Sequence, residues 1–403
     1  MPKTVVMVGA LDTKGEDFAY VKALIERGGA RTVVVDFGVM GEPAFPPDVA
    51  RAEVAGAGGA NLAQLADGDH KDLAMRAMSD GLAVVVRRLY DEGRLDGILG
   101  MGGGGGTSIA TAAMRALPVG VPKVMVSTLA GGDVHEYAGL KDITFMPSIV
   151  DVAGLNRISR RIYANAAGAI LGMVQVEAPP AAADKPILTA SMFGNTTTAV
   201  GHARGIFEAA GYEVLVFHAT GVGGRTMESL IADGYVTGCF DLTTTEIADQ
   251  VCGGVLDAGP DRMMAAARAG IPTLLAPGCV DMANFGGIET VPEKYRGRTL
   301  YQWNPNITLL RTDVAENARM GAMIAAAANA STGPVAVLLP LRGVSMLDSA
   351  GGAFWDPAAD AACFDAIRAD LKPGIPLIEV DANINDPAFS GKCAETLLEL
   401  LRS

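Results

Sequence analysis

The chain has 403 residues, of which 50 are glycine, and half of its residues are hydrophobic. The glycine excess has no Gly-X-Y period, which excludes a collagen-like fibre, and the hydrophobic content excludes a disordered glycine-rich chain. The formal net charge is −13. Because such a surface repels phosphate backbones and anionic membranes, neither nucleic acid nor a membrane is an expected partner.

The five cysteines are widely spaced and form no C-x-x-C pair. They indicate reduced, mostly buried thiols and a cytoplasmic protein. The N-terminal Met-Pro-Lys leads at once into a strand-like run, without the pattern of a signal peptide. The longest uncharged stretch, 320–341, is broken by Gly333 and Pro334, so a helix, a turn and a strand are expected there rather than a membrane span.

Short β-branched runs alternate with helical patterns in the first half of the chain, as in folds with parallel sheets. The expected strands are 4–8, 32–35, 97–99 and 123–126. The expected helices are 17–27, 71–90, one after Thr107, and 155–175. This pattern predicts an α/β domain with a doubly wound sheet.

The pattern starts again after residues 177–186, a Pro- and Ala-rich segment that we interpret as a linker. Strands are expected at 187–190, 213–217, 272–275, 335–339 and 377–380. Helices are expected at 199–210, 227–232, 315–328 and 361–371, followed by a closing helix. We therefore predict two Rossmann-like, mostly parallel subdomains, residues 1–180 and 181–403.

A glycine run follows the third expected strand and leads into a helix. It comprises Gly102, Gly103, Gly104, Gly105 and Gly106, followed by Thr107 and Ser108. Glycine lets backbone N–H groups approach an anion, and hydroxyls at a helix start donate to phosphate oxygens. Neither the P-loop pattern nor the acidic partner of a dinucleotide fingerprint is present. We interpret the run as a site for a mononucleotide or another phosphorylated ligand, with a tight structural loop as the alternative.

Two further loops are expected at the same sheet edge. Asp12, Thr13 and Lys14 follow the first strand and are candidates for contacts with phosphate, ribose or metal, a capped turn being the alternative. The loop after the fourth strand offers a second place for an anion, with Asp133 as the candidate Mg²⁺ ligand. Its other candidate residues are Ser127, Thr128, Gly131 and Gly132.

Polar residues also follow the strands of the second half. Together they predict a site for a hydroxyl-rich ligand or an anion, although helix capping explains each loop alone. His218, at a strand end, is the candidate general acid or base, because imidazole titrates near neutral pH. The substrate-binding candidates are Asn195, Thr196, Thr197, Thr220, Gly223, Gly224 and Thr244.

Seven longer motifs stand in order along the chain. They are Leu11–Gly15, Gly102–Thr107, Asp151–Asn156, Val216–Gly221, Leu242–Glu246, Asn304–Pro305 and Phe354–Pro357. Together they resemble the ATP-binding domain family named for the tomato mosaic virus resistance protein. The resemblance implies two Rossmann-like subdomains, ATP in the first of them, and a homodimer. It supplies no reaction, because the bacterial and fungal members are largely without an assigned one. The plant members carry an additional C-terminal barrel domain, and antiviral inhibition is not expected of this chain.

These observations predict an ATP- and Mg²⁺-binding protein that acts on a small polar or carboxylate metabolite in a cleft between its two lobes. The expected chemistry is phosphoryl transfer or ATP-driven activation. Lys14 and the glycine amides are expected to stabilise phosphate charge, Asp133 to hold the metal, and His218 to move a proton. The alternative is a non-catalytic nucleotide-sensing or inhibitory binding protein.

Overall fold

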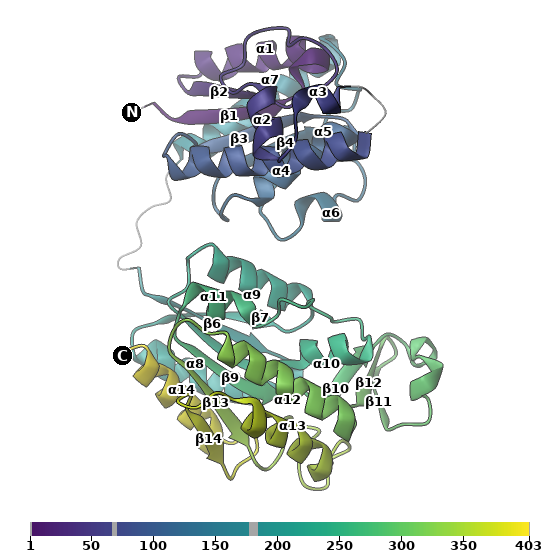
Figure 1. Cartoon of the computed structure of the whole chain (residues 1–403), viewed down its shortest axis with the longest axis vertical. Helices are drawn as coiled ribbons and strands as arrows, with labels where there is room; N and C mark the ends of the chain where they lie inside the picture. The colour runs from purple at the N-terminus through teal and green to yellow at the C-terminus, as the bar shows by residue number, and fades with distance from the viewer. Residues whose placement is uncertain (1, 67–70, 177–183, 403) are drawn as a thin grey trace. The chain divides into compact units, whose positions relative to one another are not determined.

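The chain divides into unit 1, Met1–Pro180, and unit 2, Ala181–Ser403, and each has its own parallel β-sheet (Figure 1). The computed structural model describes residues 2–66, 71–176 and 184–402. The segment interpreted as a linker lies outside the described residues, except for residues 184–186.

The sheet of unit 1 has five parallel strands in the order β2-β1-β3-β4-β5. Their central residues are mostly valine, isoleucine, leucine and methionine and are largely buried, as a sheet covered on both faces requires. The strands are β1 (Thr4–Gly9), β2 (Arg31–Asp36), β3 (Gly97–Gly102), β4 (Lys123–Ser127) and β5 (Thr144–Pro147).

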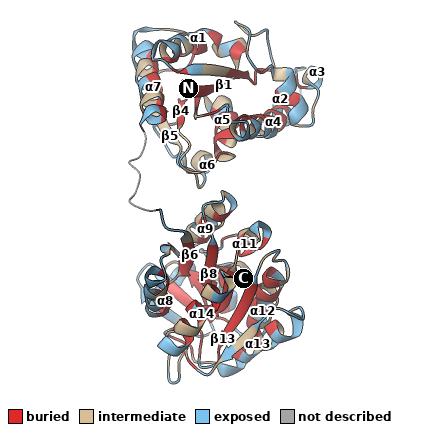
Figure 2. Cartoon of the chain, turned by 90° about the vertical axis from the view of Figure 1, so that its left-hand side faces the viewer, coloured by how far each residue is buried: buried red, intermediate tan, exposed pale blue. Residues whose placement is uncertain are grey.

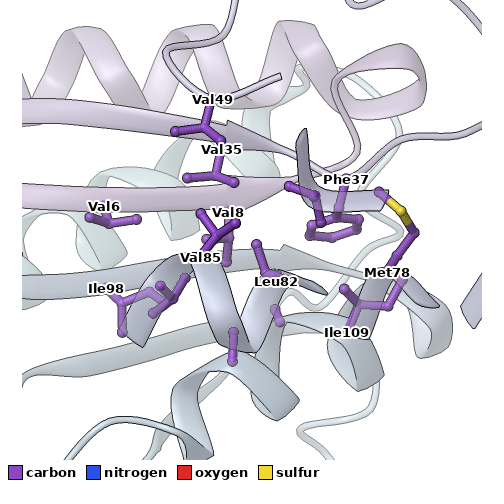
Figure 3. Close-up of a cluster of buried hydrophobic side chains, with 14 of the residues drawn as sticks. Val6, Val8, Val35, Phe37, Val49, Met78, Leu82, Val85, Ile98 and Ile109 are labelled. Carbon is purple, nitrogen blue, oxygen red and sulfur yellow. The ribbon is translucent and has the colours of Figure 1, made fainter. Parts of the chain in front are cut away.

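Helices cover both faces of this sheet. One core, which includes Val8, Leu82 and Ile109, lies between the sheet and helices α4 and α5 (Figure 3). The other core is built around Phe18 and Tyr163, which belong to α1 and α7. The helices are α1 (Leu11–Arg27), α2 (Arg51–Ala57), α3 (Leu62–Leu65), α4 (Lys71–Asp91), α5 (Gly104–Arg115), α6 (His135–Ala138) and α7 (Arg157–Gln175).

Unit 2 contains a six-stranded parallel sheet in the order β14-β13-β9-β8-β6-β7. A separate three-stranded antiparallel sheet, in the order β10-β12-β11, was not predicted from the sequence. The parallel strands are β6 (Ile187–Met192), β7 (Glu213–His218), β8 (Gly238–Thr243), β9 (Thr273–Gly278), β13 (Val335–Pro340) and β14 (Leu377–Val380). The antiparallel strands are β10 (Met282–Phe285), β11 (Leu300–Asn304) and β12 (Ile307–Arg311).

The helices of unit 2 also pack on both faces of its parallel sheet. One core contains Phe207, Phe240 and Phe389, and another contains Met320, Ile324 and Phe364. Figure 2 shows buried residues in the strands and exposed residues on the outer sides of the helices. The helices are α8 (Thr197–Ala209), α9 (Val222–Ala232), α10 (Thr245–Cys252), α11 (Met264–Ala269), α12 (Val314–Asn329), α13 (Pro357–Asp370) and α14 (Pro387–Leu400), with 3-10 turns η1 (Gly194–Thr196), η2 (Ile288–Thr290) and η3 (Glu293–Tyr295).

The predicted fold class, two Rossmann-like units with doubly wound parallel sheets, is confirmed by these strand orders. The five cysteines are buried, with free thiols. Nowhere in the described residues is there a helix with both the length and the apolar character needed to span a membrane.

Two helices begin earlier than expected. Helix α1 starts at Leu11 instead of residue 17, so Asp12, Thr13 and Lys14 lie in its first turn rather than in a loop. Helix α5 starts at Gly104, so most of the glycine run is helical and Gly103 is its N-cap. Glycine is typical of turns, so its presence led us to place both helix starts too late in the chain. Local propensity is a weak guide to such boundaries, because tertiary context overrides it.

Candidate functional site

The glycine run of unit 1 lies where the winding of the sheet changes direction. The chain passes from β1 to β2 on one side of β1, and then to β3 on the other side. Strands β1 and β3 are direct neighbours, with Val8 paired to Gly100. In open parallel sheets, ligands collect outside the carboxyl ends of two such strands. The residues that follow Gly9 and Gly102 therefore border the expected ligand crevice.

Four successive glycines at the start of α5 are not required by the packing of the chain. A Cβ atom added at Gly103, Gly104, Gly105 or Gly106 would lie 3.7, 4.0, 3.6 or 3.6 Å from its nearest neighbour, which is ordinary contact. Gly102 differs, because a Cβ there would lie 3.1 Å from the Cα of Gly106. Glycine destabilises a helix interior by about 1 kcal/mol relative to alanine. Internal packing therefore does not account for these four residues.

The N–H groups of these glycines are available as donors. Within the described part of the chain no group accepts a hydrogen bond from residues 103–106, whereas the N–H of Thr107 bonds to the oxygen of Gly103 at 2.8 Å. Gly104 and Gly105 are also exposed. Free N–H groups and the positive end of the helix dipole make such a helix start suitable for an anion.

Two of the predicted phosphate donors are instead engaged in the interior. Thr107 and Ser127 are fully buried, and their hydroxyls are 2.7 Å apart. The Ser127 Oγ also accepts the N–H of Leu129 at 3.0 Å. This pair fastens the start of α5 to the end of β4, which corrects the prediction that the two hydroxyls bind a cofactor.

The other two predicted hydroxyl donors remain accessible. Thr128 is exposed, and its Oγ1 lies 3.7 Å from the position of a Cβ on Gly103. Ser108, in the first turns of α5, is partly exposed. Both hydroxyls therefore stay candidate donors to an anion at this helix start.

The start of α1 is held by two carboxylates. Asp36, fully buried at the end of β2, accepts the N–H groups of Leu11 at 3.0 Å and Gly38 at 2.9 Å. Burial raises the pKa of Asp36, and the two backbone hydrogen bonds oppose that shift. Asp12 accepts the N–H groups of Met40 at 2.8 Å and Gly41 at 3.1 Å. Asp12 therefore binds the segment after β2 through its Oδ2, while its Oδ1 has no hydrogen-bond partner among the described residues, so its contact with a cofactor stays a prediction.

Thr13 and Lys14 remain candidates for contact with an anion. Thr13 is exposed and Lys14 is half-buried. Lys14 forms no ion pair with any residue that the structure describes. Its ammonium group is therefore not neutralised by any carboxylate among the described residues of unit 1.

An apolar pocket adjoins the glycine run. Its volume is about 390 Å³, and Figure 3 shows Phe37, Met78 and Ile109 together at one end of the adjoining hydrophobic cluster. Met75, which lines the pocket, has its sulfur 3.6 Å from the position of a Cβ on Gly105. A flat apolar group in this pocket would therefore lie next to the free N–H groups of α5.

The predicted metal ligand, Asp133, lies in the exposed turn after β4 with the predicted cofactor-binding residues Gly131 and Gly132. Asp133, Gly131 and Gly132 are all exposed, and the Oδ1 of Asp133 accepts the N–H of His135 at 2.9 Å. No group of three or more His, Cys, Asp or Glu residues suited to a metal ion occurs in residues 2–66, 71–176 and 184–402. Asp133 thus offers one carboxylate oxygen to an ion that brings its other ligands.

The glycine loop of unit 2 is occupied by a side chain of the protein itself. The Oε1 of Glu246 accepts the N–H groups of Gly221 at 2.6 Å and Gly224 at 3.1 Å, at the start of α9. A Cβ on Gly224 would lie 2.2 Å from the Glu246 carboxylate, and one on Gly223 would lie 1.8 Å from the oxygen of His218. Close internal packing therefore requires both glycines, which corrects their assignment to a substrate.

Glu246 belongs to a buried ion cluster around Arg262. The Nε of Arg262 donates to Glu246 at 2.6 Å, and its Nη2 donates to Asp241 at 2.7 Å. Glu228 lies 3.3 Å from Nη1. Although burial lowers the pKa of Arg262, the three carboxylates raise it well above its ordinary value. This cluster joins β8, α9 and α10 and holds the loops at this edge of the sheet.

Two of the predicted threonines of unit 2 are buried. The hydroxyl of Thr196 lies 2.8 Å from that of Thr243, and the hydroxyl of Thr244 donates to the oxygen of Ala276 at 3.2 Å. The loops after β6 and β8 converge as expected, but their hydroxyls bond within the protein. This corrects the assignment of Thr196 and Thr244 to a substrate. Thr197 is exposed, and its hydroxyl donates to the oxygen of Phe193 at 3.2 Å.

His218, Thr220 and Asn195 line one pocket at the ends of β6 and β7, which has a volume of about 280 Å³. The ring of His218 stands edge-on to Phe193, with ring centroids 5.4 Å apart. The Thr220 hydroxyl donates to the oxygen of His218 at 3.2 Å. The structure therefore brings these three predicted residues together and separates them from Gly223, Gly224 and Thr244.

Comparison with known proteins identifies the family. The profile of the N-terminal domain of an uncharacterised protein family, UPF0261, matches residues 3–179, and that of its C-terminal domain matches residues 185–401. The chain belongs to the UPF0261 family. A UPF0261 protein of Clostridium tetani is 46% identical over 402 residues, which is 100% of both chains. A UPF0261 protein of Rhizobium meliloti is 46% identical over 395 residues, 96% of each chain.

The resemblance to the family of the tomato mosaic virus resistance protein is confirmed. The ToMV resistance protein Tm-1 of Solanum lycopersicum is 38% identical over 339 residues, which cover 82% of this chain and 45% of that protein. Among solved structures, a UDP-N-acetylglucosamine 2-epimerase from Rickettsia bellii covers 100% of this chain and 96% of its own at 11% identity, with a TM-score of 0.22. MurG of Acinetobacter baumannii covers 99% of this chain and 100% of its own at 10% identity, with a TM-score of 0.23. Scores this low support no inference about function.

Sequence reasoning missed several residues that shape the loops and the pocket of unit 2 in this UPF0261 protein. Glu246 stands in the Leu242–Glu246 motif, so its acidic side chain beside a strand end was a usable signal. Arg262 carries no local motif, and only the tertiary structure places it. Asn284 belongs to the polar segment 277–285, a loop candidate in the sequence, but no role could be assigned to it there. The aromatic Trp303 lies on β11, whose antiparallel sheet was not expected. Residues brought together from distant segments in this way cannot be found by motif spacing.

Proposed function

We propose that unit 1 of this UPF0261 protein binds ATP with Mg²⁺ at the carboxyl ends of β1 and β3. The observation that carries the proposal is the start of α5, where four glycines that internal packing does not require present N–H groups with no acceptor in the described chain. Glycine at such positions suits close approach of phosphate oxygens to the backbone. The missing P-loop and dinucleotide patterns favour a nucleotide site of another type.

The surroundings of the glycine run fit the parts of a nucleotide. The pocket of about 390 Å³ is lined by Lys71 and otherwise by apolar residues such as Phe37, Met75 and Ile109, and it takes the base. Thr128 and Lys14 supply a hydroxyl and a positive charge for the phosphates. This division of roles follows the usual design of such sites, in which apolar walls bury the ligand and few polar groups orient it.

Mg²⁺ fits the site as an ion carried by the nucleotide. Mg²⁺ in nucleotide sites keeps several waters and takes one or two carboxylates together with phosphate oxygens. Asp133 is the exposed carboxylate of the turn after β4 and is the residue that would hold the ion. When bound, Mg²⁺ neutralises phosphate charge.

The reaction class that we propose is phosphoryl transfer to a small metabolite, or its activation by ATP. In unit 1, Lys14 and the α5 amides stabilise negative charge on the phosphates. In the pocket of unit 2, His218 is the group that holds or receives a proton of a bound molecule. A non-catalytic nucleotide sensor is the second candidate. It is favoured by the lining of the pocket of His218, which contains no Asp, Glu, Lys or Arg to act on a charged metabolite.

Isothermal titration of the full chain with ATP, ADP and inorganic phosphate, with and without Mg²⁺, tests the nucleotide site. We expect ATP to bind more tightly than phosphate alone, because the base pocket adds apolar contact. Equal affinity for ATP and phosphate would contradict the role of that pocket. Assays for ADP, AMP and pyrophosphate in the presence of candidate metabolites separate the enzyme from the sensor, which binds ATP without consuming it.

A further inference from the structure

The pocket at the ends of β6 and β7 has largely apolar and aromatic walls. All three strands of the antiparallel sheet contribute apolar side chains, among them Phe285, Trp303 and Leu309, and the loop after β6 contributes Phe193. The volume of about 280 Å³ is near the lower end of the roughly 300 to 1,000 Å³ range of ligand pockets. The pocket therefore suits a small molecule with a flat apolar body.

The same pocket offers no permanently charged side chain to a charged ligand. All of its lining residues are described by the structure, and none of them is Asp, Glu, Lys or Arg. His218 is the titratable group of the lining. Burial of a carboxylate or phosphate without a paired charge is strongly unfavourable. The pocket therefore favours a neutral molecule over the carboxylate metabolite predicted from the sequence.

Two residues of the lining each carry a buried amide oxygen that has no hydrogen-bond partner in the described part of the chain. Asn195 is 2% exposed and Asn284 is 1% exposed, and the Oδ1 atom of each is without a donor. The great majority of buried polar atoms in proteins are hydrogen-bonded, because an unpartnered one destabilises the fold. Two such oxygens on one small pocket indicate that its occupant brings hydrogen-bond donors.

The orientation of the Asn284 amide is fixed by Asp249. The Asn284 Nδ2 donates to the Asp249 Oδ2 at 2.7 Å, and the Asn284 N–H donates to the Oδ1 at 2.9 Å. Asp249 also accepts the N–H of Leu256, another lining residue, at 3.2 Å. Since the nitrogen of the amide faces Asp249, its oxygen is the atom left without a partner.

Asn195 is held through its main chain and its amide nitrogen. Its main-chain oxygen accepts the N–H of Met346 at 3.1 Å and the side-chain nitrogen of Asn385 at 2.9 Å. Its Nδ2 contacts the sulfur of Met282 at 3.2 Å. The acceptors on both sides of the pocket are thus positioned before any ligand binds, which lowers the entropy lost on binding.

We propose that this pocket binds a small neutral molecule with a flat apolar body and hydroxyl or N–H donors, which hydrogen-bond to the side-chain oxygens of Asn195 and Asn284. The flat body packs against Phe193 and Trp303. This proposal specifies the chemical class of the metabolite in the proposed function. It rests on the proposed function only where it treats the bound molecule as a substrate.

Ligand-observed NMR titration of the full chain without nucleotide tests the proposal with three probes. Resorcinol carries two donors on an apolar ring, its dimethyl ether lacks the donors, and meta-hydroxybenzoate adds a negative charge. We expect resorcinol to bind about tenfold or more tightly than either of the others, since each difference of about 1.4 kcal/mol is tenfold. Equal binding of the dimethyl ether, or tighter binding of the benzoate, would overturn the proposal.

Variants locate the binding in this pocket. Asn195→Leu removes one acceptor at similar volume, and Trp303→Ala removes part of the wall; each is expected to weaken resorcinol binding about tenfold. Tyr235→Ala is the control, since Tyr235 and Trp303 are each 44% exposed and Tyr235 does not line the pocket. Unchanged resorcinol binding by folded Asn195→Leu and Trp303→Ala would contradict the proposal. The resorcinol titrations are made without nucleotide, so their outcome does not depend on ATP binding. A failure of the proposed nucleotide site would therefore be detected separately.

Discussion

The Oε1 of Glu246 lies 3.1 Å from the backbone nitrogen of Gly224, in the position that a bound anion takes at a helix start. The glycine loop of unit 2 is therefore filled by the protein's own carboxylate. The glycine run of unit 1 has no such internal acceptor among the described residues. Two similar sequence features thus serve different purposes, one for internal packing and the other for our proposed nucleotide site.

Glu246→Gln is expected to lower the free energy of unfolding by about 3 to 5 kcal/mol, the usual effect of breaking a buried ion pair. The neutral amide leaves Arg262 with less compensation and places an N–H donor beside the guanidinium. Urea unfolding measures the change. ATP binding by unit 1 is expected to stay the same in the folded variant.

The control for this substitution is Glu208→Gln on α8. Glu208 pairs with Arg204 at 2.6 Å, but its side chain is 45% exposed. Exposed pairs contribute about 0 to 1 kcal/mol, so little change is expected. Equal effects of the two substitutions would contradict a structural role for the buried cluster.

Thr107→Val is expected to lower stability by about 1 kcal/mol and to leave ATP affinity unchanged, because its hydroxyl bonds to Ser127 in the interior. Thr128→Ala should do the reverse, lowering ATP affinity with little effect on stability, because the exposed Thr128 lies beside Gly103. Thermal unfolding and titration calorimetry measure the two quantities. A loss of ATP affinity in Thr107→Val at unchanged stability would restore the sequence-based assignment.

Stability is expected to fall as the pH rises from about 4 to 7, because of the buried carboxyls of unit 2. Burial raises the pKa of Asp249 from 3.8 to about 7, with the nearby Glu246 charge acting in the same direction and hydrogen bonds from Asn284 opposing it. In this window the unfolded chain releases a proton that the folded chain retains, so the free energy of unfolding decreases with rising pH. Burial also raises the pKa of Asp281 and that of Asp360.

Asp249→Asn isolates one part of this dependence. Between pH 4 and 7 the free energy of unfolding should decrease less in the variant than in the wild type. For a pKa shift of this size, the two decreases should differ by up to about 4 kcal/mol at pH 7. Asp261→Asn is the control, since the side chain of Asp261 is 71% exposed. Urea unfolding across this pH range measures both. Parallel curves for Asp249→Asn and the wild type would contradict the raised pKa.

The alternation of β-branched runs and helical patterns was sufficient to predict the fold class, because each parallel strand and each amphipathic helix carries its own periodic signal. The sequence did not predict β10, β11 and β12, whose short antiparallel strands lack such a signal. It also could not distinguish Ser127 from Thr128, neighbours in the chain. The hydroxyl of Ser127 bonds to Thr107 in the interior, whereas Thr128 is exposed to solvent. Only the packing of β4 against α5 determines which of the two residues is buried.

The candidate site, like the fold, could be predicted from the sequence only in part. The glycine run and His218 were recognisable because their residue types stand at strand ends. The roles of Gly223 and Gly224 were misassigned, because the carboxylate that occupies their loop comes from Glu246, more than twenty residues further along the chain. Asn284 and Trp303 join the pocket of unit 2 through a sheet whose position no local pattern indicates.

The most direct test of the nucleotide site compares Gly104→Ala with Gly168→Ala. Both glycines are exposed and helical, and a Cβ meets no close contact at Gly104 and nothing within 4 Å at Gly168. Both variants should be as stable as the wild type or more stable, because alanine favours a helix. Titration with ATP and Mg²⁺ should show about tenfold or greater loss of affinity for Gly104→Ala alone. Unchanged ATP affinity in a folded Gly104→Ala variant would contradict the proposed site.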